Sequence, residues 1–403
     1  MEYWGNNMYL TKQEEKMLAG EEGCAVQKSM EILVALGRIF GADRLIDVSS
    51  VQVAGVSYHN LGDAGLEYLS ELARDGRVKK NVKATLNPAG MDLKRWKNLG
   101  ISEEFAGKQM KVMDSFKKLG LEITCTCTPY FIGNKPKQGE HIAWSESSAV
   151  AYANSVLGAR TNREGGPSSL ASALTGKTAN FGLHLDENRK AEALVSIGSG
   201  VELRTVADFG ALGHAIGQKV KNKVLYVRGV REASVEQLKA FCASTATYSG
   251  TALFYMENAT PEYESAGVPK ENVAIEKRDI KESYDFLNDD CEPDFVSVGC
   301  PHASLKELEK IASLLKGRKV KKEFWIAVSR PIKELAASKG YVKVIEDAGA
   351  KLACDTCMAV APLKGRFRCL ATNSAKACYY GRGANGFKTR FCSLEECVRL
   401  AVQ

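Results

Sequence analysis

The chain has 403 residues, of which 45% are hydrophobic and 26% charged, and this balance is typical of a globular protein with two or three packed lobes. Its formal net charge of +7 is spread along the chain, and its basic clusters are short and mostly lack aromatic neighbours. That pattern argues against nucleic-acid binding. A mildly basic surface suits an anionic metabolite.

The N-terminal stretch Met1–Gly20 lacks the apolar core of a secretion signal, and the chain has no window of about 18 uninterrupted apolar residues. We therefore expect a cytoplasmic protein without membrane-spanning segments. In that compartment the 12 cysteines are expected to be thiols or metal ligands, most of them simply packed in the core, and not a disulfide framework.

In chain order, the first predicted elements are two helices within residues 11–39, separated near Gly20–Gly23. Short apolar or β-branched runs then predict strands at residues 44–56, 81–90, 121–130, 223–229, 251–257, 293–300, 323–329 and 351–357. Helical periodicity recurs between them, as at 304–317 and 331–349. This alternation predicts α/β lobes with largely parallel sheets flanked by helices. We expect interleaved lobes within one region, 1–403, with a break near 285–295.

Several predicted strands end in residues that suit a ligand site. Ligands of such sheets bind beyond the carboxyl ends of the strands. Glycine-containing polar turns follow two of the runs, at 55–60 and 86–90, and thiols end three others, at 125–127, 300 and 354–357. A site formed where these strand ends meet is therefore expected.

The cysteines have more than one interpretation. Cys354 and Cys357 have the spacing of a redox dithiol or of half a zinc site, but Cys125 and Cys127 have the wrong spacing for the second half. Alternatively, one thiol from each strand end holds an iron–sulfur cluster whose remaining iron acts as a Lewis acid in a dehydration. Packing is the commonest role of any single cysteine.

Long, ordered motifs indicate which interpretation applies. "GVSYHNLGDAGLEYL", "WSESSAVAYANSVLGARTNREGGPSSLASALTGKT", "VGCPHASLKEL", "DTCMAVAPL" and "TNSAKACYYG" are distributed over nearly the whole chain. On these motifs the chain resembles the large, catalytic subunit of the aconitase X family, in its archaeal type.

The resemblance implies an aconitase-like, multi-lobe α/β architecture that lacks the swivelling small domain. It implies a hydro-lyase that removes water from (R)-5-phosphomevalonate to give trans-anhydromevalonate 5-phosphate, with the catalytic serine base supplied by a small subunit. The implied ligands of a 4Fe-4S cluster are Cys127, Cys300 and Cys357. The implied substrate contacts are Gly55, Val56, Ser57, Asn87, Pro88, Glu146, Ser147 and Lys376.

These contacts also make physical sense. The turns at 55–57 and 87–88 offer backbone N–H groups to an anion, Lys376 offers a cation, and Glu146 offers an acceptor for a hydroxyl. Each also has an ordinary interpretation as a turn, a lone lysine or a solvated glutamate. Two alternative functions remain open here: the same chemistry on 3-hydroxyproline, and a non-catalytic zinc or dithiol protein.

Other motifs point less clearly to a site. Residues 171–178 fit a loose phosphate-loop pattern, but a helix is expected before them and a strand at 179–185 after them, the reverse of the required order, so Gly176 is expected to end a helix. His59 and His302 lie beside the predicted site and suit either proton relay or a structural role. Arg163 is a further candidate substrate contact. Within "ACDTCM" we assign Cys354 to packing, and Asp355 to loop orientation or a simple turn.

Overall fold

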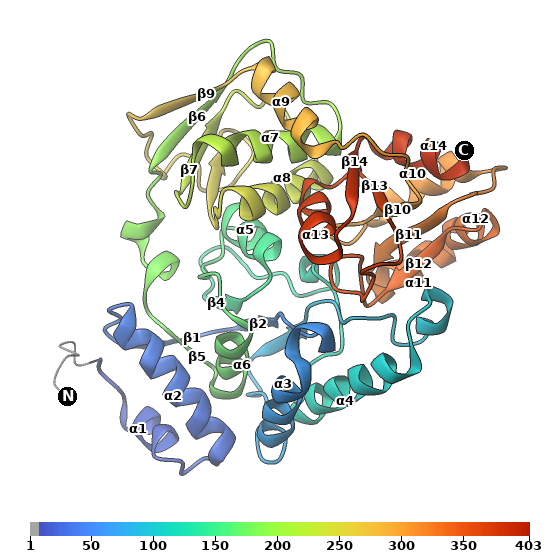
Figure 1. Ribbon diagram of the computed structural model, residues 1–403. Helices are drawn as coiled ribbons and strands as arrows, with labels where there is room; N and C mark the ends of the chain where they lie inside the picture. Colours follow the sequence, from blue (N-terminus) through green and yellow to red (C-terminus); the bar gives the residue numbers. More distant parts are fainter. Residues whose placement is uncertain (1–7) are drawn as a thin grey trace.

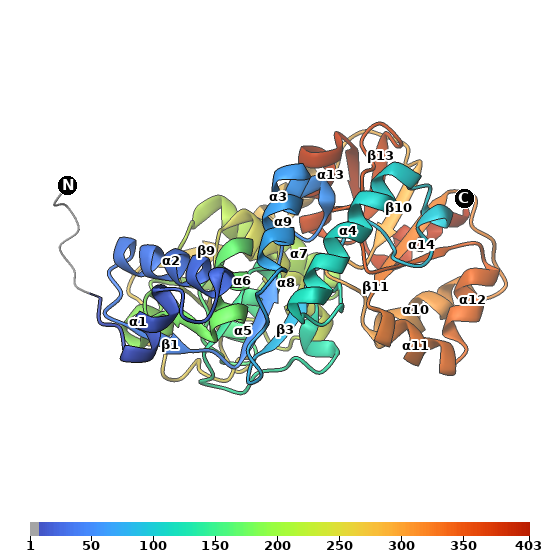
Figure 2. The same ribbon diagram turned by 90° about the horizontal axis from the view of Figure 1, so that it is seen from below.

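The computed structural model describes residues 8–403, which form three α/β lobes in chain order (Figure 1), each built around one parallel sheet. Seen from below in Figure 2, the first helices of the chain lie at one end of the molecule and the third lobe lies at the other. The prediction of α/β lobes with largely parallel sheets is confirmed, since the one antiparallel pairing between named strands joins two three-residue strands of the first lobe.

The first lobe carries the sheet β3-β2-β4. Its elements are α1 (Lys12–Leu18), α2 (Cys24–Ile39), β1 (Leu45–Asp47), β2 (Ser50–Val53), α3 (Tyr58–Leu72), β3 (Lys83–Leu86), α4 (Glu103–Leu119), β4 (Ile142–Trp144), α5 (Ser147–Ser155), α6 (Gly166–Thr175) and β5 (Lys177–Ala179). A capping box between Thr11 and Glu14 begins α1, and the predicted break between the first two helices is confirmed. Every residue of β2 is buried, as expected for the central strand of a covered parallel sheet.

Two predicted strands in the earlier part of this lobe are wrong. Residues 44–56 form two strands, because β1 pairs with β5 while β2 joins the parallel sheet. Residues 121–130 form no strand beyond an isolated bridge at Glu122, since Cys125 adopts a left-handed backbone with a φ of 42°, which ends the extended conformation.

The segment resembling a phosphate loop has the reverse order of elements, as predicted. Helix α6 ends at Gly176, whose φ of 74° suits a glycine at a helix end, and β5 follows it. The strand expected at 179–185 is wrong. Strand β5 starts earlier, and Gly182–His184 form a short 3₁₀ turn.

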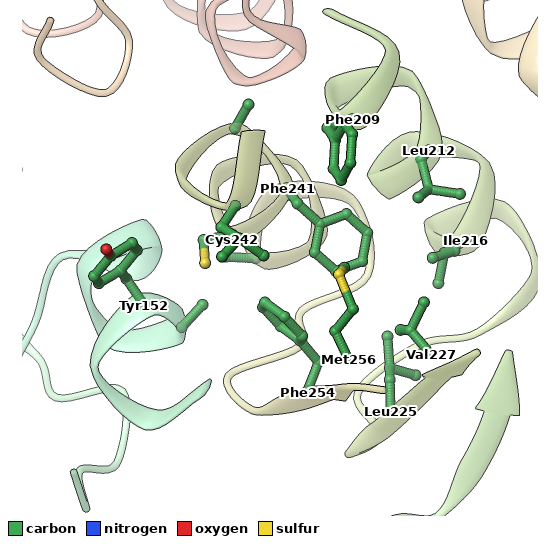
Figure 3. Packing of buried hydrophobic residues seen from close by; sticks show 14 of the residues in the cluster. Tyr152, Phe209, Leu212, Ile216, Leu225, Val227, Phe241, Cys242, Phe254 and Met256 are labelled. Carbon is green, nitrogen blue, oxygen red and sulfur yellow. The ribbon is translucent and has the colours of Figure 1, made fainter. Parts of the chain in front are cut away.

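The second lobe carries the sheet β8-β7-β6-β9. Its elements are β6 (Ala193–Ile197), α7 (Val206–Lys219), β7 (Leu225–Arg228), α8 (Val235–Tyr248), β8 (Phe254–Met256), β9 (Asn272–Ile275) and α9 (Lys277–Leu287). Its core joins α7 and α8 to the sheet, and Tyr152 of α5 lies at the edge of the same cluster (Figure 3). The first and second lobes therefore share buried apolar contacts.

The third lobe carries five parallel strands in the order β12-β11-β10-β13-β14. Its elements are β10 (Phe295–Val298), α10 (Leu305–Leu315), β11 (Glu323–Val328), α11 (Arg330–Ser338), α12 (Tyr341–Asp347), β12 (Lys351–Cys354), β13 (Cys369–Thr372), α13 (Ala375–Asn385), β14 (Lys388–Phe391) and α14 (Leu394–Val402). The strands predicted within 293–300 and 351–357 are confirmed as β10 and β12. Each of these strands leads into a loop that carries a cysteine.

The expectation that the cysteines are thiols or metal ligands is wrong for one pair. Cys291 and Cys369 are bonded, with their Cα atoms 6.3 Å apart. The bond joins the segment before β10 to the start of β13, which is possible because these two strands are parallel neighbours, with Phe295 opposite Leu370.

None of the helices in residues 8–403 is long and apolar enough to cross a membrane.

Candidate active site

A cavity of about 200 Å³ lies where the carboxyl ends of strands from the first and third lobes face each other. The structure brings all eleven predicted site residues to its wall: Gly55, Val56, Ser57, Asn87, Pro88, Cys127, Glu146, Ser147, Cys300, Cys357 and Lys376. The candidate contact Arg163 also lines it. Residues separated by more than 300 positions in the chain therefore meet at one place.

The first lobe supplies one wall through the ends of three adjacent strands. Strand β2 leads to residues 54–57, β3 leads to 87–88, and β4 leads to 145–147. Gly55 has a φ of 78°, which favours glycine and turns the chain along the cavity. The backbone N–H of Ala54 donates to Ser145 Oγ at 2.6 Å, so the first and third of these turns are joined directly.

The third lobe supplies the opposite wall in the same way. Cys300 follows β10, Cys357 follows β12, and Lys376 lies in the first turn of α13 after β13. Before Cys300, Gly299 has a φ of 88°, and a side chain there would meet the carbonyl oxygen of Ala327 on β11. Only glycine allows that close approach, which fixes where Cys300 leaves the sheet.

Three helices begin at this cavity. Ser57 is the N-cap of α3, Glu146 is the N-cap of α5, and Ser374, two residues before Lys376, is the N-cap of α13. The N-terminal end of a helix carries partial positive charge and free N–H groups. Their convergence favours an anionic ligand.

Lys376 and Glu146 form a buried ion pair across the cavity, with the lysine Nζ donating to the carboxylate. The ammonium also donates to Ser147 Oγ at 3.1 Å. Burial opposes the charge on both groups, but each partner outweighs it, so the pKa of Glu146 is lowered and the pKa of Lys376 is raised. The pair is therefore charged at neutral pH.

The three predicted cluster ligands are thiols from three different loops. Burial raises the pKa of Cys357 to about 12 and the pKa of Cys127 well above its ordinary value, and each of these thiols is also affected by a neighbouring cavity cysteine. Burial likewise raises the pKa of Cys300, although the positive charge of Lys376 opposes the shift. These thiols need a bound cation to become thiolates.

The donor set has the chemistry of an iron–sulfur site. Within residues 8–403, no three His, Cys, Asp or Glu side chains gather closely enough to hold one ion. Three thiols nevertheless line the cavity together, and thiolates are the usual ligands of iron–sulfur clusters. Beside them, the buried Asn87 Oδ1 has no hydrogen-bond partner among the described residues, as expected for an oxygen that meets a bound ligand.

Cys354 and Cys357, the alternative zinc or dithiol pair, have different surroundings. Cys354 is fully buried and packs in the apolar core of the third lobe, whereas Cys357 lines the cavity. The assignment of Cys354 to packing is therefore confirmed. Asp355, between them, has a φ of 61° and orients a neighbouring loop: its carbonyl oxygen accepts from the N–H of Ala89 at 2.7 Å, and its carboxylate pairs with Arg330.

The two histidines beside the predicted site differ. His59 is exposed on α3 and is absent from the cavity wall. His302 is fully buried, and its two ring nitrogens contact Thr126 and Thr356. Burial lowers the pKa of His302 to about 4, so the ring is neutral at physiological pH. The structural interpretation of His302 is the one that its contacts support.

Sequence reasoning missed several residues of the cavity wall: Ala54, Asn60, Ser145, Pro301, Ala359, Val360 and Tyr380. Helical spacing could have indicated two of these residues. Asn60 lies three positions after Ser57, and Tyr380 lies four positions after Lys376, so each shares a helix face with a predicted contact. Val360 had no such signal. Its carbonyl oxygen accepts from Ser57 Oγ at 3.0 Å across the two lobes.

Models of the aconitase X first, second and third domains match residues 7–187, 191–285 and 293–403. The matches follow one another along the chain, and each corresponds to one of the three lobes.

Curated relatives match over nearly the full length. The chain is 48% identical to the phosphomevalonate dehydratase large subunit of Thermococcus kodakarensis, over 98% of this chain and 100% of that one. It is 46% identical to the protein of the same name from Methanosarcina mazei, over 98% and 97% of the two chains. A cis-3-hydroxy-L-proline dehydratase of Pseudomonas aeruginosa is 32% identical over 96% of this chain and 69% of its own length.

A solved structure has the same fold. The crystal structure of Thermococcus kodakaraensis aconitase X in its holo-form matches with a TM-score of 0.92 at 47% identity, over 98% of this chain and 100% of that chain.

Proposed function

The chain belongs to the aconitase X family, and we propose that it is the large subunit of a phosphomevalonate dehydratase. The reaction is removal of water from (R)-5-phosphomevalonate to give trans-anhydromevalonate 5-phosphate. The observation that carries the proposal is the cavity itself, which unites three thiols, a buried ion pair and three helix starts. Two relatives that bear this name, from Thermococcus kodakarensis and Methanosarcina mazei, are 48% and 46% identical to the chain over 98% of its length.

Cys127, Cys300 and Cys357 are the proposed ligands of a 4Fe-4S cluster. When bound, such a cluster supplies a Lewis-acidic iron that helps a substrate hydroxyl leave as water. The three thiols come from separate loops, and other parts of the wall remain for the substrate.

The turn at residues 55–57 of the first lobe is the proposed binding site for an anionic group of the substrate. Among the residues described, none accepts a hydrogen bond from the backbone N–H of Gly55, Val56 or Ser57. Three consecutive free N–H groups on a cavity wall bind a carboxylate or phosphate well. Asn87 and Pro88 lie on the adjacent strand end, where the free Asn87 Oδ1 accepts from a substrate hydroxyl.

Glu146, Ser147 and Lys376 form the proposed polar contact on the other side. Because Glu146 is ionised, it accepts a hydrogen bond from the hydroxyl that leaves. Lys376 Nζ orients that carboxylate and also offers positive charge to an incoming anion. Arg163 is exposed at the cavity and carries no carboxylate partner among the described residues, so it suits the phosphate end of the substrate.

The base is proposed to come from a partner. The relatives are named as large subunits, which implies a second subunit. The proposed base is a serine on the swivelling domain of that subunit, and it removes a proton from the carbon next to the substrate carboxylate. The chain without its partner is then inactive or nearly so. We also propose that residues 1–403 form one catalytic region, with a break between α9 and β10 near 285–295.

The test is an anaerobic dehydration assay on (R)-5-phosphomevalonate, with the chain reconstituted with iron and sulfide, with and without its small subunit. Turnover only with the partner supports the proposal, together with loss of iron and activity in Cys300→Ala. Cys242→Ala is the matched control, since Cys242 is buried in the second-lobe core and does not line the cavity. Turnover of 3-hydroxyproline instead would reassign the substrate, and failure to bind any cluster would overturn the cofactor.

A further inference from the structure

One buried residue connects the three loops that carry the cavity thiols, and the proposed reaction gives it no role. His302 lies two residues after Cys300, between β10 and α10, and none of its surface is exposed. We call residues 124–128, 299–303 and 355–360 the three cysteine loops, because they carry Cys127, Cys300 and Cys357.

His302 touches both of the loops to which it does not belong. Its backbone N–H donates to Cys127 Sγ at 3.2 Å, and its Nδ1 lies 3.0 Å from Thr126 Oγ1 in the same loop. Its Nε2 lies 3.1 Å from the carbonyl oxygen of Thr356, the residue before Cys357. One side chain therefore bridges the first and third cysteine loops while its backbone belongs to the second.

The hydrogen atoms in this arrangement follow from the partners. A carbonyl oxygen only accepts, so Nε2 carries the proton and donates to Thr356. Nδ1 then accepts from the Thr126 hydroxyl, and Thr126 Oγ1 in turn accepts from the backbone N–H of Thr128 at 3.2 Å. Each of these hydrogen bonds then has one donor and one acceptor, which favours a single rigid arrangement.

A lysine of the second lobe binds the backbone of His302. Lys239 of α8 is buried, and its Nζ donates to the carbonyl oxygens of His302 at 3.0 Å and Pro301 at 3.4 Å. The same ammonium pairs with Glu307 of α10. The backbone of the second cysteine loop is therefore fixed independently of the His302 ring.

We propose that His302 is a positioning residue whose imidazole holds the three cysteine loops in the arrangement that binds the cluster. It contacts no part of the cavity wall that receives substrate, so it acts through Thr126, Cys127 and Thr356. Residues that orient metal ligands in this way typically change metal affinity by about 10–100-fold when they are replaced. The inference rests on the proposed function, because it presumes that the three thiols bind a cluster.

The test compares variants that remove different contacts. His302→Phe fills the space without either ring hydrogen bond. His302→Asn keeps an acceptor near Nδ1, and His302→Gln keeps a donor near Nε2. The matched control is His214→Phe, since His214 is also buried and hydrogen-bonded, to Ser283 at 2.9 Å, but does not line the cavity.

The main measurement is the rate at which the anaerobically reconstituted chain loses its cluster to an excess of chelator, followed by visible absorbance. We expect His302→Phe to lose it about 10–100-fold faster, with an altered electron paramagnetic resonance spectrum, while His214→Phe behaves as wild type. His302→Asn and His302→Gln should fall between these two. A wild-type rate and spectrum in His302→Phe would overturn the proposal.

Two further measurements keep the test decisive. If His302→Phe does not fold, Thr126→Val removes only the hydroxyl that faces Nδ1, and it must also accelerate cluster loss; an unchanged rate overturns the proposal. If wild type binds no cluster, the proposed function fails, and alkylation of the metal-free chain then tests positioning alone. Cys127, Cys300 and Cys357 should react faster in His302→Phe than in His214→Phe, and equal rates would rule out the positioning role.

Discussion

Two buried lysines among the described residues hold the same kind of partner, but only one of them lines the cavity. Lys376 and Glu146 have side chains that are 9% and 6% exposed, and Lys239 and Glu307 have side chains that are 2% and 13% exposed. Lys376 lines the cavity, whereas Lys239 is absent from its wall and donates to backbone carbonyls behind it.

The comparison shows that a buried ion pair does not by itself mark an active site. What distinguishes the two is the remaining hydrogen-bond partners. Lys376 meets Ser147 and Ser148, hydroxyls that can turn toward a ligand, while Lys239 meets Pro301 and His302 carbonyls that hold one loop in place. We therefore expect the first pair to affect turnover and the second to affect stability and cluster retention.

The largest effect is expected from Lys376→Met. Loss of a charged donor from the reacting site should reduce turnover by about 100-fold or more, while the iron content of the reconstituted protein stays at the wild-type level. The measurement is the anaerobic assay with the small subunit, together with iron analysis. Lys97→Met, which changes an exposed lysine, is the control. Turnover equal to that of the control would mean that Lys376 does not contribute to the reaction.

Lys239→Met should act on stability. It leaves the Glu307 carboxylate without its buried partner and two carbonyl oxygens without a donor, which is expected to lower the free energy of unfolding by about 3–5 kcal/mol. Urea titration of the metal-free chain measures this, and faster cluster loss should accompany it. An unfolding free energy equal to wild type would mean that the ammonium is replaced by water without cost.

A double variant sharpens the difference between the pairs. Lys376→Met alone leaves the buried Glu146 carboxylate without its cationic partner. Adding Glu146→Gln should recover roughly 1–3 kcal/mol of unfolding free energy, because burial of a neutral amide costs less free energy than burial of an unpaired carboxylate. Both carboxylates also accept from a backbone N–H, but Glu307 is more exposed than Glu146, so Glu307→Gln should recover less in Lys239→Met. Equal recovery at both pairs would mean that the difference in exposure between Glu146 and Glu307 has no energetic effect.

The position of the site could be predicted because strand ends in parallel sheets meet at one edge. Residues 55–57, 87–88, 300 and 357 all lie at the carboxyl ends of predicted strand runs, and all line the cavity. Cys127 shows the limit of that rule. Its predicted strand is absent because Cys125 adopts a left-handed backbone, yet Cys127 still reaches the wall through the irregular loop that this conformation creates. Lys376 and Glu146 were assigned by family resemblance.

Features that depend on the order of strands in a sheet were beyond prediction. The Cys291–Cys369 disulfide spans 78 residues and exists because β13 lies next to β10, a neighbour that local sequence does not reveal. The contacts of His302 need the relative positions of three loops from two lobes. Neither arrangement leaves a periodic signal in the residues involved.

The smallest effect concerns pH. Burial raises the pKa of Glu146, but Lys376 more than offsets this and lowers it below the ordinary value of 4.5. A lowered pKa in the folded state contributes stability that is fully present above 4.5 and is lost as the pH falls toward the folded value. The advantage of wild type over Glu146→Gln in unfolding free energy should therefore shrink below pH 4.5.

That decline cannot exceed about 1.4 kcal/mol per pH unit, because a single carboxylate binds a single proton. Urea titrations of the two metal-free chains at a series of acidic pH values measure it, with Glu307→Gln as the parallel variant at the other pair. A difference between wild type and Glu146→Gln that stays constant across this window would mean that folding does not lower the pKa of Glu146. Lys376 would then not stabilise the ionised carboxylate, and the role assigned to the pair in binding the substrate hydroxyl would have to be withdrawn.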